Sequence, residues 1–349
     1  MALPALQVVR ESFAGAHITL LSNADMGAAR VSTQDLIPAG LINEWLTYPS
    51  NENGADPFAM IRLLASLRRR EFDTLVYLAP RLRSPLKLRR DLIFFRLAGI
   101  RHFIGNTGFE PLPRKIEGKP LAGVVHEVDH LLHRLRLSGL QSATSGDHKI
   151  NLHLTGEEQE AAERWLLGHA TGYPNTSLIG FGPGSKWPSK VWPEHRFAEL
   201  GERLIDECDV YPVIFGGVED RALGERLIRA WGKGANAAGT LPVRQSAAAL
   251  ARCQAYVGND TGTMHLASAV DTPCVVTMSA QDWPGHWDPY GSGHTVLRRS
   301  LPCEGCMLKV CKHEGLRCLQ EILVAEVLDA CKGTLGRVRA EPKSLATSH

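Results

Sequence analysis

The chain lacks the features that mark membrane-spanning, exported and nucleic-acid-binding proteins. None of its apolar runs approaches the roughly 18 residues that a membrane span needs. The N-terminus has no basic segment followed by a long apolar run, so it does not predict a signal peptide. A formal net charge of +2 over 349 residues gives no general attraction to nucleic acid. We therefore expect a cytoplasmic protein with no transmembrane segment and no nucleic-acid partner.

Several common catalytic signatures are also missing. The sequence has no Walker A loop, no Gly-x-Ser-x-Gly elbow and no His-Glu-x-x-His motif. The stretch most similar to a dinucleotide fingerprint begins at Gly180, but Ser185 stands where its third glycine should be. These absences argue against an ATPase, a hydrolase, a zinc protease and a dehydrogenase.

What the chain does contain is a repeated alternation of strands and helices, which predicts parallel sheets covered on both faces. A Ser-, Thr- and Gly-rich stretch at 141–149 predicts a linker, and the end of the chain is polar and basic. We predict two α/β domains, 1–150 and 151–333, followed by a tail at 334–349. The main predicted helices are 4–13, 57–70, 85–97, 124–137, 155–167, 194–207, 219–231, 245–253 and 263–270. The predicted strands are 16–21, 73–78, 101–104, 177–181, 210–215, 237–239, 255–257 and 273–278.

The most informative stretch is 256–270, which predicts a buried strand, a tight turn and a short apolar helix. Asp260 is the predicted N-cap, and Thr261 and His265 are four residues apart, so they would share one helix face. A helix N-terminus presents free N–H groups and a positive dipole end, which suit a phosphate. The competing interpretation is an ordinary capped helix.

Two other turns follow predicted strands and contain residues suited to a ligand. The loop after 177–181 contains glycines, Ser185 and Lys190, while Glu219 follows the strand at 210–215. Each turn alone is consistent with a solvated loop. Ligands bind at the carboxyl ends of parallel strands, so three such turns on one sheet favour a binding site.

These segments together resemble glycosyltransferase family 9, the ADP-heptose:lipopolysaccharide heptosyltransferases and their relatives. The likeness lies in 182–197, 215–217, 258–265 and 287–291 and extends over nearly the whole chain. It implies a GT-B fold, with two Rossmann-like doubly wound domains facing a cleft. It also implies inverting, metal-independent transfer of heptose or a related sugar from an ADP-sugar to a lipopolysaccharide core or similar acidic glycan. The N-terminal domain would bind that acceptor, and the protein could work at the surface of the inner membrane.

The resemblance also implies roles for individual residues. Lys190 would face the leaving diphosphate, Glu219 would bind the ribose, and Leu241 would lie against adenine. The full implied donor-binding set is Ser185, Lys190, Glu219, Leu241, Asp260, Thr261, Gly262 and His265. The family takes its catalytic base from a Gly-Asp turn after its first strand, and this sequence begins just past that position. We assign no base here and expect that the start is placed too far downstream.

Two alternatives remain open. One is a catalytically silent nucleotide-sugar-binding protein, and the other is a different GT-B transferase or an epimerase. A basic stretch follows the strand at 73–78 and would suit an acidic acceptor or simply face solvent. Its candidate residues are Arg81, Arg83, Lys87 and Arg89.

The chain has eight cysteines, four of which are closely spaced near its C-terminus. They form a C-x2-C-x4-C-x6-C pattern that could hold a structural zinc or iron, although similar cysteines occur in relatives of the family without always implying metal. They are Cys303, Cys306, Cys311 and Cys318. No cofactor is expected for the transfer itself.

Overall fold

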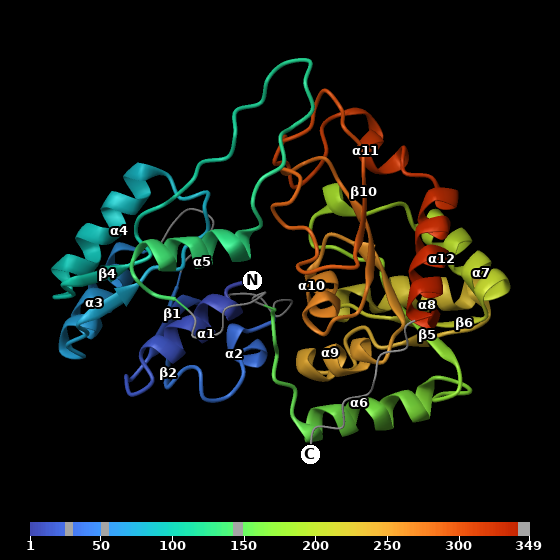
Figure 1. Cartoon of the computed structure of the whole chain (residues 1–349), viewed down its shortest axis with the longest axis horizontal. Helices are drawn as coiled ribbons and strands as arrows, with labels where there is room; N and C mark the ends of the chain where they lie inside the picture. Colours follow the sequence, from blue (N-terminus) through green and yellow to red (C-terminus); the bar gives the residue numbers. More distant parts are fainter. Residues whose placement is uncertain (25–30, 50–55, 142–148, 341–349) are drawn as a thin grey trace. The chain divides into compact units, whose positions relative to one another are not determined.

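The computed structural model describes residues 1–24, 31–49, 56–141 and 149–340. The chain forms two compact units (Figure 1). The N-terminal unit comprises Met1–Pro113 and Val125–Ile150, and the C-terminal unit comprises Arg114–Val124 and Asn151–His349. Most of the predicted linker at 141–149 lies outside the described residues. No helix in the described ranges is long and apolar enough to cross a membrane.

The N-terminal unit contains two separate pairs of parallel strands, β1 with β2 and β3 with β4. Within the described residues no strand pairing joins the two pairs. Strand β2 was not predicted. The elements are α1 (Leu3–Ser12), β1 (Thr19–Ala24), α2 (Thr33–Leu36), β2 (Glu44–Pro49), α3 (Pro57–Arg69), β3 (Thr74–Val76), α4 (Pro85–Leu97), β4 (His102–Ile104) and α5 (Glu127–Leu137).

A buried arginine holds the ends of β3 and β4 together. Arg134 on α5 donates to the carbonyl oxygens of Tyr77 and Ala79, both at 2.6 Å, and to that of Gly105 at 2.9 Å. Its guanidinium also lies 3.6 Å from the ring centre of Phe109. Burial lowers the pKa of Arg134 to about 10. A single side chain therefore satisfies carbonyl groups that the short strands leave without partners.

The C-terminal unit contains one parallel sheet of six strands in the order β10-β9-β8-β5-β6-β7. Its helix α6 begins with a capping box, in which Thr155 and Glu158 each accept the other's backbone N–H. The helices are α6 (Gly156–His169), α7 (Glu194–Cys208), α8 (Arg221–Trp231), α9 (Val243–Ala251), α10 (Gly262–Ala269), α11 (Arg317–Gln320) and α12 (Val324–Ala340). The strands are β5 (Ser177–Gly182), β6 (Val210–Ile214), β7 (Ala235–Asn236), β8 (Ala255–Asn259), β9 (Cys274–Met278) and β10 (Thr295–Arg298). Short 3-10 turns occur at η1 (Pro188–Lys190), η2 (Val218–Asp220) and η3 (Glu314–Leu316).

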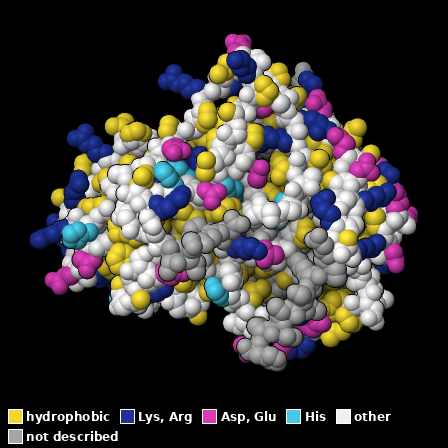
Figure 2. Space-filling model, in the orientation of Figure 1, with side chains coloured by type: hydrophobic (Ala, Val, Ile, Leu, Met, Phe, Trp, Pro, Cys, Tyr) yellow, Lys and Arg dark blue, Asp and Glu magenta, His cyan; other side chains and the backbone are white. Residues whose placement is uncertain are grey.

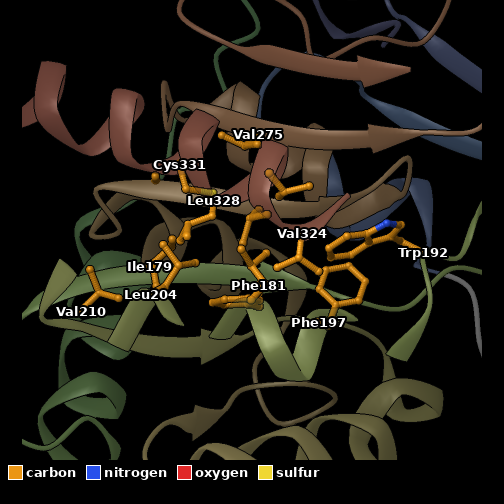
Figure 3. Close-up of a cluster of buried hydrophobic side chains, with 14 of the residues drawn as sticks. Ile179, Phe181, Trp192, Phe197, Leu204, Val210, Val275, Val324, Leu328 and Cys331 are labelled. Atoms are coloured by element: carbon orange, nitrogen blue, oxygen red, sulfur yellow. The ribbon is translucent and has the colours of Figure 1, made fainter. Parts of the chain in front are cut away.

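The alternation of side chains along the strands fills an apolar layer on each face of this sheet. On one face, Ile179 and Phe181 of β5 belong to the same cluster as Leu204 of α7 and Leu328 of α12 (Figure 3). On the other face, Leu178 belongs to a second cluster that includes residues of α6, α9 and α10. With both faces covered, the edge at the carboxyl ends of the strands is where loops can form a site.

Two predicted boundaries are wrong. The strand expected at 237–239 lies two residues earlier, as the short strand β7. The expected tail at 334–349 begins too early, because α12 continues to Ala340 and residues 341–349 are outside the described range. Helix α12 continues because Val324, Val327 and Leu335 repeat at helical spacing and are buried. Strand β10 at the sheet edge was also not predicted.

The segment Arg114–Val124 belongs to the C-terminal unit although it was assigned to the first domain. The backbone N–H of Val124 donates to the carbonyl oxygen of Pro284 at 2.8 Å. The N–H of Leu121 donates to the Glu304 carboxylate at 2.5 Å, and that carboxylate is buried. Lys115 donates to the backbone carbonyl of Glu304 at 2.8 Å. These contacts place the segment against the loops that follow β9 and β10.

One fully buried side chain, Asn259 at the end of β8, connects the loops on both sides of its strand. Its amide nitrogen donates to the carbonyl oxygen of Pro183 at 2.7 Å, in the loop after β5. Its amide oxygen accepts from the backbone N–H of Trp192 at 3.0 Å and from the hydroxyl of Thr277 in β9 at 3.1 Å. Three segments that are far apart in the sequence are thereby fixed to one side chain.

We expect Asn259→Ala to lower the free energy of unfolding by about 3 kcal/mol, because it removes three hydrogen bonds and leaves buried backbone groups without partners. Asn259→Asp should cost less, since the carboxylate can still accept while the donor to Pro183 is lost. Urea unfolding followed by circular dichroism measures both. Asn175→Ala at an exposed loop position is the control and should stay within about 0.5 kcal/mol. Equal stability of the Asn259→Ala and Asn175→Ala proteins would contradict this account.

Candidate functional site

The carboxyl ends of β5 and β8 bring two charged side chains together. Lys190, in the loop after β5, places its Nζ 2.5 Å from Oδ2 of Asp260, which follows β8. The side chain of Asp260 is 7% exposed and that of Lys190 is 17% exposed. The loops after neighbouring parallel strands meet at one edge, which explains how residues so distant in sequence form a contact.

Helix α10 begins differently from the prediction. Its N-cap is Thr261, in extended conformation with φ −153°, and no side chain caps the helix by a hydrogen bond. Asp260 was the predicted cap, but it pairs with Lys190 instead. Thr261 and His265 were expected to share one face of this helix. Thr261 precedes the helix in extended conformation, so helical spacing does not apply to this pair. The first N–H groups of α10, beginning at the exposed Gly262, therefore remain available at the positive end of the helix dipole.

The electrostatic environment of Asp260 combines burial with neighbouring charges of both signs. Burial raises the pKa of the Asp260 carboxyl above its usual value, and the adjacent Lys190 ammonium opposes that rise. Asp282 also raises it and Arg298 lowers it, so both groups lie near this pair. A buried carboxylate and a half-buried ammonium held in contact form a preorganised dipole in a region of reduced dielectric.

The loop after β9 contributes polar residues that we did not predict. His286 is fully buried, and its Nδ1 lies 2.9 Å from Oδ1 of Asp282. Burial raises the pKa of Asp282, but the hydrogen bond and charge of His286, the N–H of Trp283 and the charge of Lys190 together outweigh it, and the pKa is lowered. The Ser189 hydroxyl lies 3.1 Å from Oε1 of Gln281, which connects this loop to the turn that holds Lys190. The sequence signal for this loop was three polar residues, Ser279, Gln281 and Asp282, directly after a buried strand.

Beyond β6, the carboxylate that lies against the glycine turns is that of Asp220, the neighbour of the predicted ribose-binding Glu219. A Cβ on Gly184 would lie 1.9 Å from the Asp220 carboxylate, and one on Gly216 would lie 2.5 Å from it, so only glycine allows this approach. Burial raises the pKa of Asp220, although the N–H of Gly217 donates to it at 3.0 Å. Glu219 itself is exposed, which leaves its carboxylate accessible to a ligand hydroxyl.

The remaining predicted donor residues lie on loops, or at the start of α10, beyond the strands of the same sheet. Ser185 is half-buried, and its hydroxyl lies 3.4 Å from the backbone N–H of Trp187. Leu241 follows β7 and packs against the apolar cluster that includes α9 and α10. His265 lies in the first turn of α10 and is half-buried. The structure thus places the whole predicted set beyond the strand ends of the C-terminal unit.

In the N-terminal unit, two of the four predicted acceptor cations are engaged in ion pairs. Arg81 is buried, and its Nε lies 3.2 Å from the buried Glu127 carboxylate. Arg83 forms an ion pair with Asp91, which also accepts from the Tyr77 hydroxyl at 2.6 Å. These two guanidinium groups therefore hold the fold together. The other two predicted residues, Lys87 and Arg89, are exposed on α4.

The four cysteines predicted to hold metal lie near one another. Burial raises the pKa of the Cys318 thiol, and the other three cysteines of the set add to that rise. The Cys311 thiol donates to the carbonyl oxygen of His313 at 3.1 Å. No group of three His, Cys, Asp or Glu residues in the described ranges is placed to hold a metal ion. The thiol chemistry suits zinc or iron, but the observed arrangement is not a finished coordination sphere.

The metal hypothesis remains a prediction that analysis of the purified protein can decide. It predicts about one zinc or iron per chain, because four thiolates make one tetrahedral site. Cys306→Ser should remove the metal, whereas Cys208→Ser, outside this set, should retain it. Inductively coupled plasma mass spectrometry measures the metal, and a thiol reagent counts free cysteines. A metal-free protein in which all four thiols titrate would exclude the site.

Sequence comparison relates the chain to known proteins. Residues 60–317 match the profile of glycosyltransferase family 9 (heptosyltransferase). Lipopolysaccharide heptosyltransferase 2 of Salmonella typhimurium is 39% identical over 129 residues, which is 35% of this chain and 36% of that protein. Lipopolysaccharide heptosyltransferase 1 of Pseudomonas aeruginosa is 31% identical over 144 residues, 40% of this chain and 39% of that protein. These alignments therefore span little more than a third of each relative.

Structural comparison extends over almost the whole chain. A glycosyl transferase family 9 protein from Veillonella parvula superposes with a TM-score of 0.71 at 21% identity, covering 96% of this chain and 93% of the other. The ADP-heptose heptosyltransferase II of E. coli superposes with a TM-score of 0.63 at 20% identity, covering 97% and 95%. Likeness at these identities shows the shared fold, which confirms the expected GT-B class. The family match covers well over half of the sequence, and the chain belongs to glycosyltransferase family 9.

Proposed function

We propose that this protein transfers heptose, or a related sugar, from an ADP-sugar donor to a lipopolysaccharide core or similar glycan. The observation that carries the proposal is the contact between Lys190 and Asp260 beside the uncapped start of α10. This arrangement gathers positive potential at the edge of a parallel sheet, where nucleotides commonly bind. The sequence relatives with heptosyltransferase names support the choice of sugar and acceptor.

The donor site is built around the diphosphate. The free N–H groups at the start of α10 and the Lys190 ammonium would bind the phosphate oxygens. Glu219 would accept from the ribose hydroxyls, and Leu241 would lie against the base. His265 and Asp260 would contact the phosphates and the sugar. Each of these groups follows a strand of one sheet, so one bound nucleotide can span them.

The proposed chemistry is displacement at the anomeric carbon with inversion of configuration. As the bond to the diphosphate breaks, negative charge grows on the leaving oxygen. Lys190 and the dipole of α10 stabilise that charge without reorganisation, because Asp260 already holds the ammonium in place. The proposed route uses no metal. The carboxylate base that takes the acceptor proton is not assigned to any residue of this sequence.

Lys190→Ala should lower kcat for sugar transfer by roughly 10²–10³, the usual scale for one preorganised electrostatic donor. The KM for the donor should rise much less, because charge on the diphosphate develops mainly in the transition state. Steady-state assays with ADP-heptose measure both values, on this chain and on the chain extended upstream in its reading frame. Lys332→Ala, on α12 and paired with Glu207, is the matched control and should leave both values unchanged.

Calorimetric binding of ADP separates the alternatives. ADP binding with sugar transfer by either form supports the enzyme. ADP binding without transfer by either form indicates the silent nucleotide-sugar-binding protein. A folded chain that does not bind ADP would remove the donor site from this location. Equal kcat values for the Lys190→Ala and Lys332→Ala proteins would show that Lys190 does not act on the leaving group.

A further inference from the structure

The hydroxyl groups of Tyr256 and Thr263 meet at the start of α10. Tyr256 belongs to β8 and is fully buried, whereas Thr263 is the second residue of α10 and is half-buried. Their oxygen atoms lie 2.8 Å apart, in a hydrogen bond that either hydroxyl could donate. Neither hydroxyl has a further partner among the residues that the structure describes.

Two paired glycines make room for this contact. Gly182 of β5 is the strand partner of Gly258 in β8, and Tyr256 lies two residues before Gly258, so its side chain is on the same face of the sheet. A Cβ on Gly182 would lie 1.8 Å from the phenol oxygen of Tyr256 and 2.6 Å from Oγ1 of Thr263. One on Gly258 would lie 2.5 Å from the same phenol oxygen. Because these glycines have no side chains, the phenol ring can extend along its strand to the carboxyl edge of the sheet.

The pair has two hydroxyl hydrogens but only one hydrogen bond, so one hydrogen is left over. If Thr263 donated to Tyr256, the phenol hydrogen would be buried without an acceptor, which is unfavourable. Burial also raises the pKa of the Tyr256 phenol, so the phenol keeps its proton and can donate. Tyr256 is therefore the donor, and the hydrogen left over belongs to Thr263, whose side chain is only half-buried.

This hydrogen lies at the proposed binding position of the donor diphosphate. The N–H of Met264 donates to the carbonyl oxygen of Thr261 at 3.1 Å, so the free N–H groups of α10, within the described residues, are those of Gly262 and Thr263. The hydroxyl of Thr263 belongs to one of these same two residues. A phosphate oxygen that accepts from the start of α10 can therefore also accept from this hydroxyl.

A second buried hydroxyl at this edge of the sheet also lacks a partner. Ser279 follows β9, the neighbour of β8, and is 3% exposed. Its Oγ makes no hydrogen bond within the described part of the chain. Buried polar groups are normally paired, so unused hydroxyl groups at the carboxyl ends of adjacent strands indicate a place for a polar ligand.

The wider surface of the C-terminal unit gives an anion little long-range attraction. On the face shown in Figure 2, the Lys and Arg side chains of this unit are interspersed with Asp and Glu. Opposite charges at such spacing offset one another within about a Debye length, roughly 8 Å at physiological ionic strength. The affinity for a diphosphate must therefore come from oriented donors within the site, such as the Lys190 ammonium.

We propose that the hydroxyl of Thr263 donates a hydrogen bond to a phosphate oxygen of the bound nucleotide-sugar, and that Tyr256 is the positioning residue that directs this hydroxyl. The inference rests on the proposed function, because it names a further group in the same donor site. Thr263 is absent from the donor-binding set that the family resemblance implies, although its neighbours Gly262 and His265 belong to it. The signal for it is the buried phenol beneath the helix start, which only the fold reveals.

Isothermal titration calorimetry with ADP, on variants of the full chain, tests this contact. Thr263→Val removes the hydroxyl and should weaken ADP binding about tenfold or more, because a hydrogen bond to a charged acceptor is lost. Thr263→Ser keeps the hydroxyl and should stay within about twofold of the unchanged chain. Tyr256→Phe leaves the Thr263 hydroxyl present but undirected. It should weaken binding at most about threefold, since the hydroxyl still visits the donating one of about three staggered positions. Added to Thr263→Val, Tyr256→Phe should have no further effect on ADP affinity.

The matched controls are Tyr211→Phe and Thr334→Val. Tyr211 donates to the carbonyl oxygen of His169 at 3.2 Å and Thr334 to that of Ala330 at 2.9 Å, both outside the candidate site. Both variants should bind ADP like the unchanged chain. Thermal melting confirms that each variant is folded, and Thr263→Ala takes the place of Thr263→Val if the latter does not fold.

Three results would overturn the inference. Equal weakening by Tyr256→Phe and Thr263→Val would mean that their hydrogen bond only holds the start of α10 in place. Unchanged ADP affinity of the folded Thr263→Val protein would exclude the contact with phosphate while leaving the proposed donor site intact. An unchanged chain that binds no ADP would remove the donor site itself, and this inference with it.

Discussion

The amide side chain of Asn259 is the constraint on which the candidate site depends. It lies fully buried at the end of β8 and hydrogen-bonds to the loop after β5, to the chain leading into α7 and to β9. The amide donates to the Pro183 carbonyl and accepts from two neighbours at once, which an ionised carboxylate of the same shape cannot do. Because Lys190 lies two residues before one of these anchored points, the amide also fixes where the ammonium can reach.

Unlike the hydrogen bonds of Asn259, the ion pair of Lys190 and Asp260 is not expected to add much to the stability of the fold. Removing two charges from water is costly, and their attraction often does no more than offset that cost. A buried ion pair is therefore weak evidence for stability, and replacement by apolar residues would fill the same space. The pair holds the Lys190 ammonium beside the uncapped start of α10. A diphosphate bound there would need positive potential at that position. The burial that raises the pKa of Asp260 also strengthens that potential.

Local patterns predicted much of the C-terminal unit and some of the N-terminal unit. The bounds of α4 follow from residues next to one another, and the structure confirms them. Asp260 was assigned as a cap because caps are local, but a lysine far away in sequence binds it instead. The pairing of Arg81 with Glu127 and the amide of Asn259 were missed for the same reason. Partners chosen by tertiary packing leave no periodic signal, so a single sequence does not reveal them.

The net charge of the whole chain does not reveal where its charges lie. A net charge of +2 excluded a general attraction to polyanions, and for the chain as a whole that reasoning stands. Electrostatic attraction, however, acts within about one Debye length, roughly 8 Å at physiological ionic strength, so a partner meets local charge and not the total. Helices α3 and α4 together have seven cations and one buried carboxylate, so they are locally basic whatever charge the rest of the chain carries.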